Sequence, residues 1–147
     1  MSVLVIATDA TWSRERSAAA GARAALCRHL HSPGEAVPLT PSACLWVAQQ
    51  HDEAGQAAEP NALASALVAF LQLPVRQLRG TACITGWREQ RARPLTAVQD
   101  TAFAQVLHAV QAMPAYLALH AQAGRVAAAW HFTENQTDPE TDSRSMP

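Results

Sequence analysis

Residues 75–94, with the sequence VRQLRGTACITGWREQRARP, join a strand-like apolar run to the densest positive charge in the chain. The run from Gly80 to Gly86 is short, partly β-branched and bounded by glycines, which is typical of a buried strand, and Trp87 follows at its end. Five arginines and one glutamate give this stretch a net charge of +4, whereas the whole chain is formally -1. Because guanidinium groups form bidentate hydrogen bonds with phosphates and carboxylates, the stretch is the candidate site for an anionic partner.

The candidate anion-binding residues are the arginines of this stretch and the tryptophan beside them. They are Arg76, Arg79, Arg88, Arg91, Arg93 and Trp87. A tryptophan next to an arginine can stack on a base, so nucleic acid is one expected partner and an acidic protein surface is another. The alternative is a solvated loop whose arginines pair with carboxylates elsewhere in the chain.

Length and composition predict one globular domain of ordinary size. The chain has 147 residues, of which 49% are hydrophobic and 16% charged, and no apolar run reaches the roughly 20 residues of a membrane span. We therefore expect no membrane association. The N-terminus lacks the basic region of a signal peptide, and the three cysteines do not suggest a disulfide framework, so we expect the cytoplasm.

The absence of lysine excludes several kinds of catalytic chemistry. All eleven cationic side chains are arginine, so the chain can have no phosphate-loop lysine, no Schiff-base lysine and no Ser-Lys dyad. No dinucleotide fingerprint and no nucleophile elbow is present either. The spacing of cysteine and histidine matches no standard zinc module. We expect no metal and no cofactor.

The hydrophobic pattern predicts alternating helices and strands along the chain. Strands are expected at 3–7 and 80–86, and a further pair at 115–120 and 125–132 is expected to form a C-terminal β-hairpin. Helices are expected at 13–31, 61–73 and 96–113, the last with a capping box formed by Thr96 and Gln99. Residues 41–54 favour a helix that starts at Thr40-Pro41, although 44–48 would also suit a strand.

This order predicts a layered α/β or α+β domain over residues 1–132. Its core is expected to be a mixed sheet of about four strands with helices packed on it. Residues 133–147 have four acidic side chains and one arginine, a net charge of -3, and almost no large apolar residue. They are expected to form a disordered acidic tail, because they cannot bury enough surface to offset the entropy of ordering.

Two other classes of function stay open from the sequence. Asp9 directly follows the first apolar strand, and ligands of open α/β sheets bind beyond the carboxyl ends of the strands, so a small hydrolase or nucleotide-handling enzyme could use it. An Asx turn or a helix cap is the structural alternative for the same residue. A chain with four tryptophans and many alanines could also be an oligomeric assembly protein. The working hypothesis is a non-catalytic binding module for an anionic partner.

Overall fold

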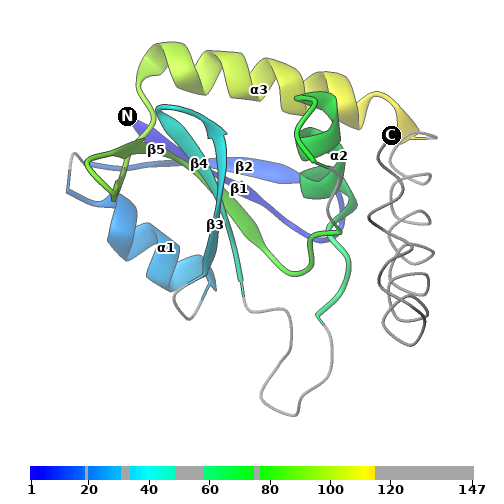
Figure 1. The fold of residues 1–147 in the computed structure, drawn as a ribbon, viewed down its shortest axis with the longest axis horizontal. Helices are drawn as coiled ribbons and strands as arrows, with labels where there is room; N and C mark the ends of the chain where they lie inside the picture. Colours follow the sequence, from blue (N-terminus) through cyan, green and yellow to red (C-terminus); the bar gives the residue numbers. More distant parts are fainter. Residues whose placement is uncertain (19, 31–33, 49–57, 75–76, 115–147) are drawn as a thin grey trace, which may run out of the picture.

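The chain forms an α+β fold in which helices cover both faces of one antiparallel sheet (Figure 1). The computed structural model describes residues 1–18, 20–30, 34–48, 58–74 and 77–114. The strands are β1 (Ser2–Ile6), β2 (Trp12–Arg16), β3 (Glu35–Thr40), β4 (Ala43–Val47), β5 (Ala82–Arg88) and β6 (Arg91–Arg93). The helices described are α1 (Ala22–Leu30), α2 (Ala62–Phe70) and α3 (Ala97–Gln111). The strand order is β2-β1-β5-β4-β3, and β6 pairs with β5.

Each face of the sheet buries its own hydrophobic cluster. Leu4, Leu45 and Ile84 point to one face and pack with residues of α2 and α3, such as Leu67 and Leu107. The alternate positions of the same strands point to the other face, because side chains of a strand alternate in direction. There Val3, Val5 and Cys83 pack against Ala25 and Leu26 of α1. The central strands β1 and β5 are therefore buried on both faces.

A hairpin replaces the first part of the helix that was predicted for residues 13–31. Residues 12–16 form β2, which pairs with β1 from Ser2↔Arg16 to Ile6↔Trp12, and α1 begins only at Ala22. Ala10 in the connecting turn has a φ of 68°, a left-handed conformation that reverses the chain. The prediction from Ser13 onward was wrong because pairing with a neighbouring strand outweighs the local preference for helix.

A second hairpin replaces the helix that was favoured for residues 41–54. Residues 43–47 form β4, so the alternative assignment of this region to a strand is the correct one for the part described. The Thr40-Pro41 pair that resembles a helix start belongs to the turn between β3 and β4 instead. There the Ser42 N–H donates to Thr40 Oγ1 at 3.2 Å. The same hydroxyl chemistry serves a turn or a helix cap, so the local signal does not distinguish them.

Four predicted elements are confirmed. Strand β1 covers most of the predicted 3–7. Helix α2 lies within the predicted 61–73, strand β5 covers most of 80–86, and α3 lies within 96–113. The capping box of α3 is present: Thr96 Oγ1 accepts from the Gln99 N–H, and Gln99 Oε1 accepts from the Thr96 N–H. These elements carry strong local signals, namely helical periodicity with a cap and a β-branched run between glycines.

The sheet differs from the expected mixed sheet of about four strands in the direction and in the number of its strands. Every strand pair in the described ranges is antiparallel, and the sheet has six strands, including the short β6. The predicted C-terminal hairpin at 115–132 and the predicted acidic tail at 133–147 lie outside the described residues. So do Arg76 and the end of the 41–54 segment.

Candidate anion-binding surface

The β5–β6 hairpin gathers three of the candidate arginines on one face of the sheet. The register pairs Arg88 with Arg91 and Gly86 with Arg93, and cross-strand partners in an antiparallel pair point to the same face. Arg88, Arg91 and Arg93 therefore project together. Trp87 and its partner Ala92 point to the opposite face, where Ala92 packs against the cluster beneath α1.

The hairpin arginines are exposed and only weakly compensated. Arg88 contacts Glu89 at 3.8 Å, and both side chains are more than 70% exposed, so this ion pair is largely screened by water. The side chains of Arg91 and Arg93 make no hydrogen bond or ion pair with any residue that the structure describes. Like charges directly across a strand pair are destabilising, as at Arg88 and Arg91. A bound anion would relieve this repulsion.

Two backbone features hold the arginines close together. Glu89 and Gln90 form the turn with φ values of 54° and 65°, the left-handed pair that a two-residue type I′ turn requires. A Cβ atom on Gly86 would lie 3.0 Å from the Pro94 carbonyl oxygen and 3.2 Å from that of Arg93. Gly86 therefore permits the close approach of the chain after β6 to β5.

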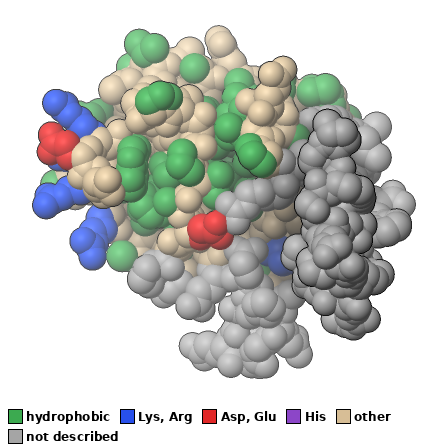
Figure 2. All heavy atoms as spheres, in the orientation of Figure 1, with side chains coloured by type: hydrophobic (Ala, Val, Ile, Leu, Met, Phe, Trp, Pro, Cys, Tyr) green, Lys and Arg blue, Asp and Glu red, His purple; other side chains and the backbone are tan. Residues whose placement is uncertain are grey.

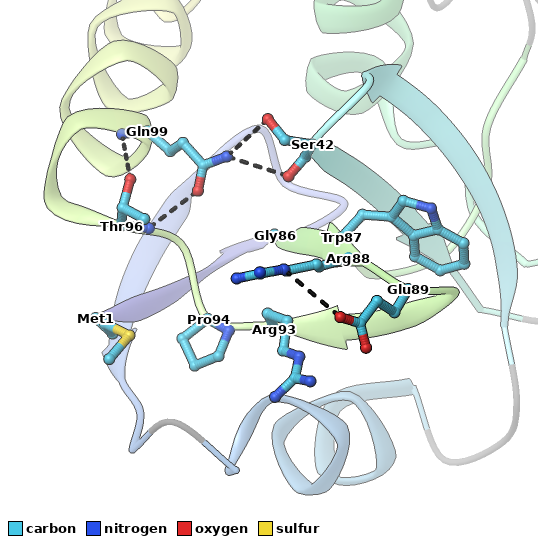
Figure 3. Close-up of a pocket in the computed structure, with 10 residues that line it drawn as sticks. All are labelled: Met1, Ser42, Gly86, Trp87, Arg88, Glu89, Arg93, Pro94, Thr96 and Gln99. Atoms are coloured by element: carbon cyan, nitrogen blue, oxygen red, sulfur yellow. Dashed lines mark hydrogen bonds and ion pairs between the residues drawn. The ribbon is translucent and has the colours of Figure 1, made fainter.

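A shallow pocket of about 370 Å³ lies at the base of this hairpin (Figure 3). Arg88 and Arg93 line it together with residues from the N-terminus, the β3–β4 turn and the start of α3. The other lining residues are Met1, Ser42, Gly86, Trp87, Glu89, Pro94, Thr96 and Gln99. In Figure 3 the Arg88 side chain extends to the side where Met1 and Pro94 lie, whereas the Trp87 ring lies on the other side of the strand.

The polar floor of the pocket is held by its own hydrogen bonds. The Gln99 amide nitrogen donates at 3.1 Å to both the backbone oxygen and the hydroxyl oxygen of Ser42, while its oxygen completes the capping box with Thr96. The Trp87 N–H donates to the Ser42 carbonyl at 2.9 Å. These groups bond mainly to one another, so the arginines are the side chains best placed to bind a ligand.

Arg79 does not belong to this cluster. It precedes β5, whereas Arg88 ends it, so the seven-residue strand separates them. Its guanidinium donates to the Ala58 carbonyl at 2.9 Å. The hairpin from Arg88 to Arg93 therefore carries only +2 of the net charge of +4 counted for residues 75–94.

The structure adds two arginines to the hairpin end of the molecule. Arg16 ends β2 opposite Ser2, and Ser2 bridges to Leu95 just beyond β6. Arg23 lies in the first turn of α1, which packs on β6. In the described ranges neither arginine side chain makes a hydrogen bond or an ion pair. Sequence reasoning missed both, because Arg16 comes close to the hairpin only through strand pairing across β1, and Arg23 only through the packing of α1 on β6.

One surface of the molecule shows the result of this arrangement (Figure 2). Arginine side chains and one acidic side chain project at its left edge, where the β5–β6 hairpin lies in Figure 1. Hydrophobic side chains gather beside them, over the region of β3 and β4. The cationic edge and an apolar area are therefore neighbours on one face.

Two partly exposed tryptophans lie on the sheet face opposite to the hairpin arginines. The ring centroids of Trp46 in β4 and Trp87 in β5 are 5.6 Å apart, with the ring planes inclined at 49°. The Trp46 indole N–H donates to Thr85 Oγ1 at 2.8 Å, which fixes the orientation of that ring. Such tilted aromatic pairs are favourable beyond their burial.

Asp9 lies in an Asx turn between β1 and β2. Its carboxylate accepts the Thr11 N–H at 3.1 Å and the Thr11 hydroxyl at 2.5 Å. These hydrogen bonds hold the pKa of Asp9 below its ordinary value. The expectation of a ligand at this position came from the rule for parallel strands, and β1 pairs only with antiparallel neighbours in the described ranges. The position of Asp9 after β1 is therefore not the one at which parallel sheets bind ligands.

The two buried cysteines are not activated nucleophiles. Burial raises the pKa of the Cys44 thiol to about 11 and that of the Cys83 thiol to about 12, so both stay protonated near neutral pH. Cys27 is exposed on α1. In the described ranges no three His, Cys, Asp or Glu side chains come together as a possible metal site.

No protein-family model, curated protein or solved structure matches this chain. No helix in the described ranges is long and apolar enough to cross a membrane.

Proposed function

We propose that this chain is a small binding module that holds an anionic partner at the β5–β6 hairpin. The observation that carries the proposal is the projection of Arg88, Arg91 and Arg93 from one face of the hairpin, exposed and with only Glu89 in opposition. Guanidinium groups in such a cluster can bind phosphates or carboxylates in bidentate fashion. The partner class is nucleic acid or an acidic protein surface.

The surroundings of the hairpin support this proposal. Arg16 and Arg23 extend the positive charge at the same end of the molecule, and α1 and α3 both begin there. The N-terminal end of a helix carries a partial positive charge, which adds to the attraction for an anion. The pocket beside Arg88 and Arg93 provides a concave surface.

The proposal predicts the effect of removing the three hairpin arginines together. The probes are heparin and a labelled oligothymidine, titrated at several salt concentrations. The triple variant Arg88→Ala, Arg91→Ala, Arg93→Ala should bind both at least about tenfold more weakly at low salt. The slope of log affinity against log salt should fall by about 2, because fewer counterions are released.

Two variants serve as controls. A triple replacement of the same arginines by lysine keeps the charge, so it should retain most of the salt slope while it loses affinity that depends on bidentate contacts. Arg79→Gln at the other end of β5 should leave binding unchanged. Melting temperatures show that each variant is folded. Unchanged affinity and salt slope in the folded alanine variant would refute the proposed function.

A further inference from the structure

The aromatic pair next to the hairpin bears on the class of anionic partner. Trp87 lies between Gly86 and Arg88 in β5, and across the strand pair its partner Ala92 lies between Arg91 and Arg93. One short ribbon thus presents cations on one side and an aromatic ring on the other. A flexible polymer that crosses the end of this ribbon meets both.

The Trp46–Trp87 pair has the properties of a stacking platform. Both rings are partly exposed. They lie on the sheet face on which helix α1 packs against β1, β5 and β6. The hydrogen bond from Trp46 to Thr85 and the contact between the rings hold the platform in place before a ligand arrives. Since the fixed ring of Trp46 contacts Trp87, a planar ligand would stack on Trp87 with little loss of side-chain freedom.

Only one of the candidate partners uses both features. An acidic protein surface would engage the arginines and leave the tryptophans unused. In a duplex the bases stack on one another, so a ring at the protein surface has no free base to contact. Single strands expose both phosphates and base faces, and proteins that bind them combine a positively charged surface with aromatic side chains.

We infer that the anionic partner is single-stranded nucleic acid, with phosphates bound by Arg88, Arg91 and Arg93 and a base stacked on Trp87. This inference rests on the proposed function, because it assigns the ligand class of the same surface. It adds that the bases, and not only the charges, contribute to affinity.

The test compares four labelled probes of equal length in fluorescence anisotropy titrations. They are an oligothymidine of about 12 nucleotides, within the usual site sizes, an abasic sugar-phosphate oligomer, a duplex and a polyglutamate peptide. The oligothymidine should bind most tightly. Trp87→Ala should weaken it by about 5- to 100-fold, the effect of one lost stacked base, and should leave the abasic oligomer unchanged.

Matched variants keep the result independent of folding. Trp87→Phe retains an aromatic face and should keep most of the affinity for oligothymidine. Trp12 lies in β2 and donates a hydrogen bond to Gln111, so Trp12→Phe should not affect binding. Equal affinity for the oligothymidine and the abasic oligomer would overturn the inference, as would tighter binding of the duplex or the polyglutamate. In each of these cases the proposed function survives if the triple arginine variant still loses binding.

Discussion

Asp100 links the first strand to the last described helix. The Arg14 guanidinium donates to its carboxylate at 2.6 to 3.0 Å, and the Ser2 hydroxyl, from the start of β1, donates to it as well. The hydrogen bonds from Arg14 hold the pKa of Asp100 below its ordinary value. Asp100 is buried, whereas the Arg14 side chain is 43% exposed, so the arginine keeps much of its hydration.

Asp100→Asn should destabilise the protein in a pH-dependent manner. The lost charge-assisted hydrogen bonds should lower the free energy of unfolding by about 1–2 kcal/mol at pH 7, at the low end because Arg14 stays solvated. Because the pKa of Asp100 is lower in the folded state, its ionised form stabilises the protein. This stabilisation is complete above the pKa of the unfolded state, about 4, and is lost as the pH falls through the pKa of the folded state. Urea unfolding of both proteins between pH 2 and pH 7 measures this effect, with the difference shrinking below about pH 4. A difference that stays constant across this range would exclude ionisation as its source.

The β5–β6 turn is under backbone strain that its sequence does not relieve. Glu89 and Gln90 both adopt positive φ, where Asn and Gly are strongly preferred, and each left-handed residue without such chemistry costs about 1 kcal/mol or more. The hairpin persists because β5 is held in the sheet by β1 and β4.

Replacing Glu89-Gln90 by Asn-Gly should stabilise the protein by about 1 kcal/mol, part of the relief being offset by the entropy of glycine. The same change removes the only acidic side chain of the hairpin, so it should also strengthen binding of heparin. Chemical denaturation and heparin titration measure the two effects. Glu89→Gln is the control that changes the charge alone. A less stable Asn-Gly variant would mean that the Arg88–Glu89 contact outweighs the backbone strain.

The molecule has charge of opposite sign at its two ends. Arg16, Arg23 and the hairpin arginines lie at the end where β1 begins. At the other end acidic residues outnumber Arg79, which precedes β5. Asp9 follows β1, Glu59 contacts Thr8, and Glu35 pairs with Val47 at the end of β4. Segregated charge of this kind steers a charged partner during diffusion, an effect that salt screens.

Arg16→Ala with Arg23→Ala should slow the association of oligothymidine at low ionic strength, while the dissociation rate changes little. The difference should vanish at about 0.5 M salt, where screening confines charge effects to a few ångströms. Stopped-flow mixing measures both rates. Glu59→Gln at the far end is the control and should leave them unchanged. A change confined to the dissociation rate would mean that Arg16 and Arg23 contact the ligand directly.

Local signals in the sequence were sufficient for the elements that carry their own caps and periodicity. The Thr96–Gln99 capping box, the apolar stripe of α2 and the glycine-bounded run of β5 are contained within a few turns or one strand. Such features depend on neighbours within about four residues, so they can be predicted from the sequence alone. The positive charge around Trp87 is likewise visible in the sequence.

Only the tertiary structure decided which residues act together. Strand β2 forms because β1 pairs with it, and strand β4 forms because β3 and β5 pair with it. The periodicity within one segment does not report the energy of this pairing. The register of the two-residue turn places Arg88, Arg91 and Arg93 on one face. Arg79 lies at the opposite end of β5 and is therefore separated from them. Pairing across β1 brings Arg16 to the same end. A linear count of charges therefore located the basic segment, whereas strand pairing determined the binding surface, because pairing sets the direction of each side chain.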